Sequence, residues 1–254
     1  MNRLEFAAAL AVDAGKLAHS AFGQSAVSSK GRHDLVTEMD GEVERFIRSA
    51  IAKRYPDDAI IGEEQGGDAG SRVWILDPID GTANYARGIP HYCVSIAYLE
   101  DGVPAVGILY DPSHEWLYSA ARGQGATRNG ERLTVSPCAD MAAATVECGW
   151  STRRSTADYL ALLQRVMGAG CAIRRAGSGA LGLADVAAGR VEGYCELHIN
   201  AWDCAAGILL VQEAGGLTND FFAGDGLTAG NPLIACNSAL CDTLARVVGI
   251  PITR

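Results

Sequence analysis

The sequence lacks three features that would each indicate a particular class of protein. It has eight cysteines but no CxxC pair, and zinc or disulfide frameworks usually show tighter cysteine spacing in shorter chains. It has no apolar run long enough to span a bilayer. Its apolar N-terminal stretch is interrupted by Asp13 and Lys16, which is wrong for a secretory signal. We therefore expect reduced, mostly buried thiols in a cytoplasmic protein without a membrane segment.

Positive charge is also scarce. Lys and Arg number 21 against 30 Asp and Glu, so the formal net charge is −9. A surface that acidic repels phosphate backbones and anionic lipid, and we therefore expect neither direct nucleic-acid binding nor a membrane partner. A cluster of carboxylates that holds divalent cations would supply part of the negative excess.

Hydrophobic periodicity predicts helices and strands that alternate along the 254 residues. Helices are expected over residues 2–22, 42–55, 156–168, 179–188, 203–214 and 238–248. Strands are expected over residues 59–62, 73–76, 91–99, 103–110, 115–120, 144–149, 171–175, 191–197 and 233–236, and a polar loop over residues 25–33. The alternation predicts a layered α/β or α+β fold in a single domain, residues 1–254, with a candidate internal seam near residues 136–141.

The most informative motif is the acidic segment Asp77-Pro78-Ile79-Asp80-Gly81-Thr82, which follows a short apolar strand. A turn of this kind can bring two carboxylates to one side, with the Ile79 carbonyl between them as a third oxygen, and Mg²⁺ prefers oxygen ligands. The backbone N–H groups of Gly81 and Thr82, near a helix N-terminus, can bind a phosphate. The segment therefore predicts metal and phosphate ligands within a few residues of each other.

Other interpretations of this segment are open from its residues alone. It is compatible with an Asp- and Gly-rich surface turn. It also resembles the DxDGT motif of haloacid-dehalogenase-type phosphatases, although there the acids are two residues apart and here they are three apart. Further acids favour a site for two or more metals, because Glu63 and Glu64 follow another apolar strand and Asp203 lies near the start of an expected helix. Taken singly, Glu63 could be solvated charge and Asp203 a helix N-cap.

Four separate motifs resemble those of the inositol monophosphatase family, within the wider group of lithium-sensitive, metal-dependent sugar phosphatases that includes fructose-bisphosphatases. The matching segments are DLVTEMD at 34–40, IGEE at 61–64, WILDPIDGTANY at 74–85 and AWDCAAG at 201–207. Shorter agreements are GILYDP at 107–112, GxGAxxNG at 123–130 and EAGG at 213–216. The resemblance covers almost the whole chain and implies the alternating αβαβα sandwich of that family.

The resemblance also implies a metal-binding role for each acid. A first Mg²⁺ would be held by Glu63, Asp77 and the Ile79 carbonyl. A second would be held by Asp77, Asp80 and Asp203, and Glu63 would also support a third, looser ion. Two cations beside a phosphorus stabilise the attacking and leaving oxygens of an in-line displacement, so that no protein nucleophile is needed.

The same resemblance implies the groups that act on the phosphate and on water. The amides of Gly81 and Thr82 would bind the phosphate. Asp40 and the Thr82 hydroxyl would orient the attacking water. An alternative for Asp40 is that it only completes a capping box from Thr37 to Asp40 at the start of the helix expected over 42–55.

On the substrate's alcohol side, the resemblance implies a contact from Glu196, which lies seven residues before Asp203. Glu196 would hydrogen-bond ring hydroxyls, with Asp80 and the amides of Ser178 and Gly179 as further contacts. The alternative for Glu196 is a surface charge at a strand edge.

Three further residues have no assigned role. Lys30 resembles the family's active-site-loop lysine, but it is one residue closer to Asp34 than the family spacing. Glu64 adjoins the expected metal ligands. His198 would share the strand face of Glu196, where it either shapes substrate choice or simply ends the strand.

Together these expectations describe a Mg²⁺-dependent phosphomonoesterase that acts on inositol-1-phosphate or a related sugar or polyol phosphate. Fructose-1,6-bisphosphatase, histidinol-phosphatase and bisphosphate nucleotidase activities are alternatives. A regulatory role is a second class of hypothesis, because some bacterial relatives bind transcription or RNA-processing machinery. A catalytically dead scaffold is a third. The resemblance also implies a homodimer and inhibition by lithium.

Overall fold

The computed structural model describes residues 1–254 except residues 24–26, 32–33 and 254. For residues 27–31 and 34–37 it describes the backbone only. The expectation for the Lys30 side chain therefore lies outside the described residues. None of the helices in the described part of the chain has both the length and the apolar character needed to cross a bilayer.

The larger sheet has seven strands in the order β3-β4-β5-β6-β7-β8-β9. The strands are β3 Ala59–Gly62, β4 Arg72–Asp80, β5 Cys93–Glu100, β6 Val103–Asp111, β7 Trp116–Ala121, β8 Gly125–Arg128 and β9 Glu131–Arg132. The β3–β4 pair is parallel and the other pairs of this sheet are antiparallel. The carboxyl ends of β3 and β4 consequently lie side by side, which matters because both strands lead into acidic residues.

The second sheet has five strands in the order β11-β10-β12-β14-β13. The strands are β11 Ala172–Arg174, β10 Thr145–Cys148, β12 Gly193–Ile199, β14 Asn231–Cys236 and β13 Leu217–Thr218. A separate antiparallel pair consists of β1 Val27–Gly31 and β2 Asp34–Thr37. Residues 133–144 connect the two larger sheets.

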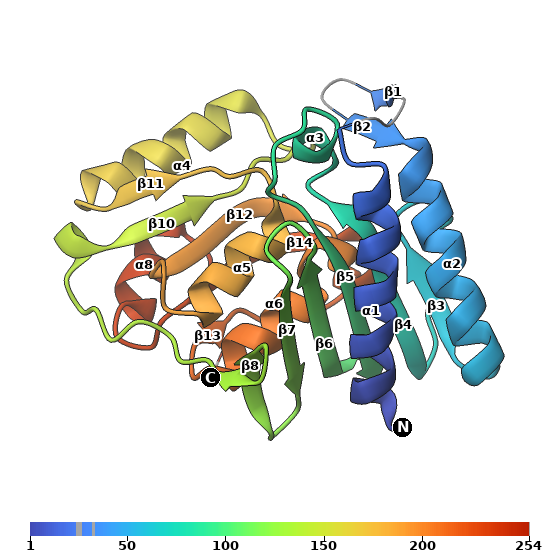
Figure 1. The fold of residues 1–254 in the computed structure, drawn as a ribbon. Helices are drawn as coiled ribbons and strands as arrows, with labels where there is room; N and C mark the ends of the chain where they lie inside the picture. Colours follow the sequence, from blue (N-terminus) through green and yellow to red (C-terminus); the bar gives the residue numbers. More distant parts are fainter. Residues whose placement is uncertain (24–26, 32–33, 254) are drawn as a thin grey trace.

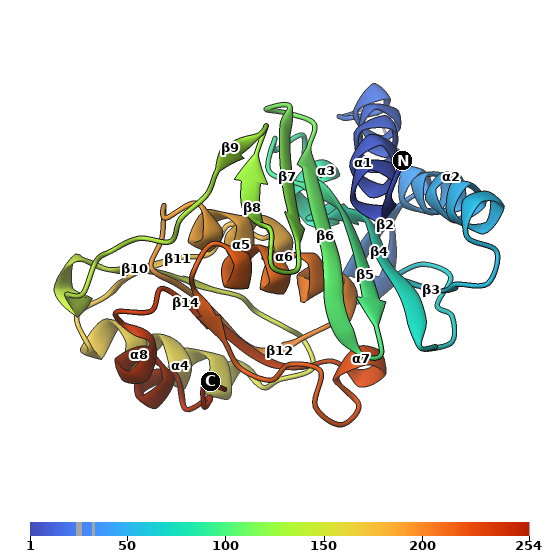
Figure 2. The same cartoon turned by 90° about the horizontal axis from the view of Figure 1, so that it is seen from below.

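Helices separate and cover the two sheets (Figures 1 and 2). They are α1 Arg3–Ser20, α2 Glu38–Arg54, α3 Thr82–Tyr85, the 3₁₀ turn η1 Met141–Ala143, α4 Thr156–Gly168, α5 Gly179–Ala187, α6 Ala201–Glu213, α7 Gly226–Ala229 and α8 Cys241–Val248. Helices α1 and α2 pack on the outer face of the first sheet, α5 and α6 lie between the sheets, and α4 and α8 cover the second sheet. The expected αβαβα sandwich is confirmed.

Helix α6 packs closely against the first sheet, and this contact sets the distance between the helix and the sheet. A Cβ placed on Gly107 of β6 would meet the Ala206 carbonyl oxygen at 2.7 Å, so only glycine fits there without a shift. The first turn of α6 carries Asp203. The packing at Gly107 therefore helps to fix where that carboxylate lies.

Several expected elements are confirmed closely. The strand 59–62 and the helix 156–168 match residue for residue. The hairpin of β5 and β6 turns at Asp101 and Gly102, which both have positive φ. All eight cysteines lie in the described part of the chain and carry free thiols, seven of them buried.

Other elements were predicted with the wrong bounds. The polar loop expected over 25–33 contains β1, because its residues pair with β2. Helix α2 begins at Glu38 rather than at 42, so Asp40 lies inside its first turn. The strand expected over 73–76 continues to Asp80, so the acidic segment belongs to a strand and not to a turn beyond it. The short elements β8, β9, β13 and α7 have too few residues to show a period, and the sequence did not predict them. A helix start was expected near Gly81 and Thr82, and α3 begins at Thr82.

Candidate metal centre and active site

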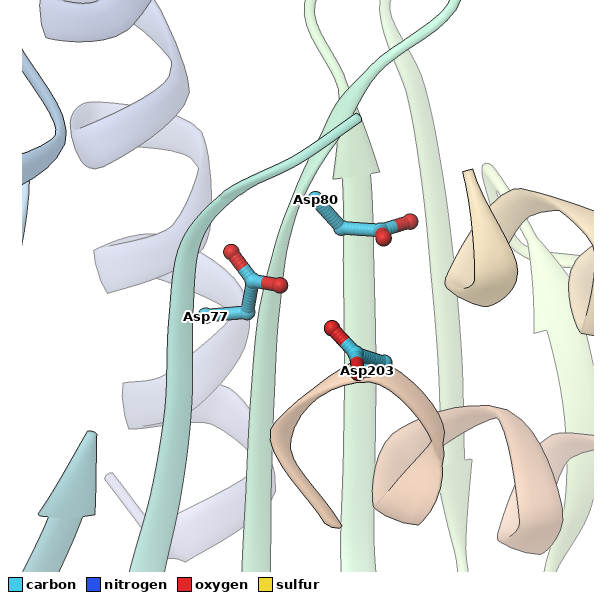
Figure 3. A group of neighbouring side chains, drawn as sticks. All are labelled: Asp77, Asp80 and Asp203. Atoms are coloured by element: carbon cyan, nitrogen blue, oxygen red, sulfur yellow. The ribbon is translucent and has the colours of Figure 1, made fainter. Parts of the chain in front are cut away.

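Three aspartates from two parts of the fold converge in Figure 3. Asp77 and Asp80 come from β4, and Asp203 comes from the first turn of α6. Each offers one carboxylate oxygen, and these oxygens all lie within 4.8 Å of one another. Asp77 and Asp80 are buried, and Asp203 is partly exposed. The sequence prediction that these acids share a site therefore agrees with their placement.

A bulge in β4 turns Asp77 and Asp80 toward the same side of the sheet. Residues three apart in a regular strand point to opposite faces. Here Asp77 pairs with Ser95 and Asp80 pairs with Cys93, so three steps along β4 match two steps along β5. Their partners Ser95 and Cys93 are two residues apart and share a face of the sheet. The extra residue in β4 therefore places Asp77 and Asp80 on that same face. Pro78 lies inside this irregularity, where an N–H for ladder pairing is not required.

Asp203 is held by the backbone at the start of α6. Asn200 is the N-cap, and Asp203 at the third helical position accepts a hydrogen bond from the Asn200 backbone N–H at 3.1 Å. Asp203 is therefore the far member of a capping box and not the N-cap that its sequence position also allowed. This arrangement fixes one carboxylate oxygen on the helix and leaves the other directed at Asp77 and Asp80 (Figure 3).

Asp80 is held by the first turn of α5. The Ser178 hydroxyl and the Ala180 amide donate to Oδ2 of Asp80, the latter at 2.9 Å, and the Gly179 amide donates to Oδ1 at 3.3 Å. The Ser178 Oγ also accepts from Leu181 N at 3.2 Å as the N-cap of α5. The amides of Ser178 and Gly179 were expected to contact substrate, and in this structure the Gly179 amide and the Ser178 hydroxyl donate to Asp80.

Burial raises the pKa of each of the three aspartates, and like charge adds to the shift at Asp77 and Asp80. Burial and then the charge of Asp203 raise the pKa of Asp80 to about 7, against the opposing hydrogen bond from Ser178. Burial likewise raises the pKa of Asp203 to about 6. Burial, followed by the charge of Glu63, raises the pKa of Asp77 well above its usual range. The three carboxylates therefore bind protons tightly unless another positive charge replaces them.

Glu63 lies beside Asp77 because of the parallel register of β3 and β4. Gly62 pairs with Leu76, and the Glu63 amide donates to the Leu76 carbonyl at 3.2 Å. The next residues of the two strands, Glu63 and Asp77, are then neighbours. The Glu64 amide points elsewhere, to a carboxylate of α2.

The Gly81-Thr82 segment joins the acids to α2. Gly81 has φ +95° and is the N-cap of the single-turn helix α3, whose first amides have no intrahelical acceptor. The Thr82 hydroxyl lies 3.1 Å from Oδ1 of Asp40 and 2.9 Å from the Ile79 carbonyl oxygen. Asp40 is fully buried. The structure therefore places next to each other the two groups that were expected to orient the attacking water.

A pocket opens next to Asp203, and Glu196 lines it. Sequence reasoning missed four other polar or aromatic side chains of its lining, which are Glu147, Trp150, Arg175 and Tyr194. The Tyr194 hydroxyl donates to Oε2 of Glu196. Tyr194 lies two residues before Glu196 on the same strand, so strand periodicity could have indicated it. The others come from β10 and from loops, and no local signal connects them to the site.

The pKa of Glu196 is also raised, to about 8, by burial, and the hydrogen bond from Tyr194 opposes this shift. His198 lies elsewhere: its Nε2 is 2.9 Å from the Ala229 carbonyl oxygen, and it is not among the residues that line the pocket. This placement fits a residue that simply lies near a strand end better than it fits a role in substrate choice.

The three converging aspartates suit a hard divalent cation. Such ions take carboxylate and carbonyl oxygens as ligands. The chain places buried carboxylates within 4.8 Å of one another, with raised pKa values that positive charge would relieve. The donor set contains no sulfur or imidazole, so soft metals are poorly matched.

Comparison with known proteins identifies relatives over most of the chain. The model of the inositol monophosphatase family matches residues 2–249. The protein named "Nus factor SuhB" from Xylella fastidiosa is 41% identical over 202 residues, which are 78% of this chain and 74% of the relative. The structure of an IMPase from Thermotoga maritima is 36% identical with a TM-score of 0.88, and the match covers 98% of this chain and 97% of that one.

A further solved structure, described as an IMPase/NADP phosphatase complexed with Mg²⁺ and phosphate, is 26% identical with a TM-score of 0.80. The match covers 92% of this chain and 90% of that one.

The raised pKa values predict how Mg²⁺ should stabilise the protein at different pH. The folded-state pKa values of Asp80 and Asp203, about 7 and about 6, exceed the ordinary value of 3.8. The folded, metal-free chain therefore binds more protons than the unfolded chain in this window, and these groups stabilise it less as pH rises from about 4 to about 7. Because Mg²⁺ requires deprotonated carboxylates, we expect a larger Mg²⁺-induced rise in Tm at about pH 8 than at about pH 5.5.

Differential scanning fluorimetry with and without saturating Mg²⁺ measures this difference. The Asp203→Asn variant is the control. At about pH 8 its Mg²⁺-induced rise in Tm should be smaller than that of the native chain. An equal shift in the native chain at both pH values would contradict proton competition at these carboxylates.

Proposed function

The chain belongs to the inositol monophosphatase family, and we propose that it is a Mg²⁺-dependent phosphomonoesterase that hydrolyses inositol-1-phosphate or a related polyol phosphate. The observation that carries the proposal is the convergence of Asp77, Asp80 and Asp203 beside a pocket. Charge crowding of this kind destabilises a fold, and a bound cation would relieve it.

We propose two ligand sets for Mg²⁺. Glu63, Asp77 and the Ile79 carbonyl would hold one ion, and Asp77, Asp80 and Asp203 would hold another, with Glu63 also near a third. The relative solved with Mg²⁺ and phosphate supports the choice of metal. When bound, the ions would make water more acidic and offset the negative charge that develops on the phosphate and on the departing oxygen.

The chain's own groups would bind and orient the reactants. The first amides of α3, from Gly81 and Thr82, would donate to the phosphate oxygens. When the Thr82 hydroxyl donates its hydrogen to Asp40, 3.1 Å away, its oxygen can still accept a hydrogen bond from water. Water held by Asp40 and Thr82 in this way would direct an oxygen lone pair toward the phosphorus, which is a gain from positioning alone.

The substrate's alcohol would occupy the pocket beside Asp203. Glu196 lines this pocket, and the Tyr194 hydroxyl donates a hydrogen bond to one of its carboxyl oxygens. The other oxygen is then available to a ring hydroxyl. Asp80 would be a further contact. This end of the site favours a molecule with several hydroxyl groups, because burying a carboxyl group requires hydrogen-bond partners for it.

Three subsidiary expectations remain part of this proposal. We propose that the chain forms a homodimer, that lithium inhibits it and that it acts in the cytoplasm. The free state of all eight cysteines supports a reducing compartment.

The Asp77→Asn variant tests the metal mechanism. Because Asp77 contributes to both proposed ion sites, kcat/KM for inositol-1-phosphate should fall by about 100-fold or more. Phosphate release from the native chain should require Mg²⁺ and should stop in excess EDTA, and lithium should reduce it. Activity that persists in excess EDTA would exclude the metal mechanism.

The Glu196→Gln variant tests the alcohol side of the site. A panel of esters should include inositol-1-phosphate, fructose-1,6-bisphosphate, histidinol phosphate and adenosine 3′,5′-bisphosphate. If Glu196 binds ring hydroxyls, the variant should lose about 10-fold or more in kcat/KM for the preferred polyol phosphate, which is the cost of an unpaired hydrogen-bonding group. It should lose little for esters that lack those hydroxyls. A uniform loss across the panel would contradict this role.

A regulatory role is a second candidate, because the relative from Xylella fastidiosa is named a Nus factor. We propose that protein binding, if it occurs in this chain, does not require catalysis. An Asp80→Asn chain expressed in place of the native one should then restore any cellular phenotype caused by loss of the protein, while phosphate release in vitro is lost. Failure to restore the phenotype at equal protein abundance would make catalysis the relevant function.

A further inference from the structure

Helix α2 carries a buried carboxylate that has no part in the mechanism described above. Glu44 is fully buried. Its Oε2 accepts a hydrogen bond from the Glu64 amide at 2.7 Å, and its Oε1 accepts one from the Gln65 amide at 3.1 Å. Arg48, one turn further along α2, donates to Oε1 at 2.6 Å. The buried carboxylate is therefore satisfied by two amides of the loop that it holds and by Arg48 of its own helix.

The held loop is the one that begins with Glu63. Gly62 and Gly66 exchange two backbone hydrogen bonds of 3.0 Å, which close the segment between them. Arg48 donates to the Gly66 carbonyl. A Cβ added to Gly62 would meet Oε1 of Glu44 at 2.4 Å, so the backbone lies directly against the carboxylate. The loop is therefore wrapped around the Glu44 side chain.

The position of Glu44 on α2 connects this loop to the water-orienting pair. Asp40, Glu44 and Arg48 are four residues apart, so they lie on one face of the helix. Asp40 contacts the Thr82 hydroxyl at 3.1 Å, and Glu44 contacts the two amides that follow Glu63. One helical face thus sets two parts of the site that are distant in sequence.

We propose that Glu44 is a positioning residue for the metal centre, which fixes the Glu63 carboxylate beside Asp77 by holding the two backbone amides that follow Glu63. The inference rests on the proposed function, in which Glu63 is a metal ligand. The reason is geometric. Glu63 is fixed on its N-terminal side by the hydrogen bond that its own amide N–H donates to the Leu76 carbonyl, and Glu44 supplies the matching anchor on its C-terminal side.

Three single variants test this role. Glu44→Gln keeps the size of the side chain but replaces one acceptor oxygen by an NH₂ group that repels a backbone N–H. Gly62→Ala displaces the Glu44 carboxylate without changing any charge. Glu42→Gln is the matched control, because Glu42 is an exposed acid on the same helix. Isothermal titration with Mn²⁺ should show binding about 10- to 100-fold weaker for the first two variants, as expected for groups behind metal ligands. The control should bind as the native chain does.

A double variant separates positioning of Glu63 from a general structural role. If Glu44 acts through Glu63, Glu44→Gln should weaken Mn²⁺ binding strongly in the native background and hardly at all in a Glu63→Gln background. High Mg²⁺ should also restore most of kcat in Glu44→Gln, since its ligands are all present. Equal weakening in both backgrounds, or native affinity in a folded Glu44→Gln or Gly62→Ala variant, would overturn the inference.

The outcome for the proposed function can be read separately. A native chain that binds Mn²⁺ with the predicted dependence on Glu44, but releases no phosphate from any ester, would refute the phosphatase and leave the positioning role intact. A native chain that binds no Mn²⁺ would overturn both.

Discussion

Repulsion among buried carboxylates is the constraint on which the rest of this structure depends. Asp77, Asp80 and Asp203 bring oxygens within 4.8 Å of one another, and Glu63 adds to the charge at Asp77. Left alone, such groups separate or take up protons. The chain keeps them together with local devices: a bulge in β4, a capping box on α6 and a set of donors from α5. Each device fixes one carboxylate without neutralising its charge, so the cluster keeps a strong preference for cations.

The site also depends on contact between the two sheets. Asp77 and Asp80 belong to the first sheet, whereas the donors to Asp80 begin α5, which lies between the sheets. Asn84 strengthens this junction, because its Nδ2 donates to the His91 carbonyl at 2.8 Å and to the Ala176 carbonyl at 2.9 Å. The residues that hold the acids are therefore in place only when both halves of the chain have folded together.

The sequence alone predicted the acids but not what holds them. The motif around Asp77 and Asp80, together with Asp203, indicated their shared chemistry, and hydrophobic runs placed strand 59–62 and helix 156–168 correctly. The bulge could not be predicted, because it exists only in the register between β4 and β5. The contacts of Glu44 with the amides of residues 64 and 65 join segments 20 or more residues apart, and no local pattern encodes them.

The charge of the pocket bears on the proposed substrate. Two acids, Glu147 and Glu196, line it next to Asp203. A second phosphate on the substrate would approach Asp203 and the buried Glu196, whereas Glu147 is paired with Arg174 at 3.4 Å and Arg175 of the lining lies over the Trp150 ring at 5.5 Å. A neutral polyol meets no such repulsion and can satisfy the buried carboxyl group of Glu196 through its hydroxyls. The lining thus supports the proposed polyol monophosphate over a bisphosphate as the substrate.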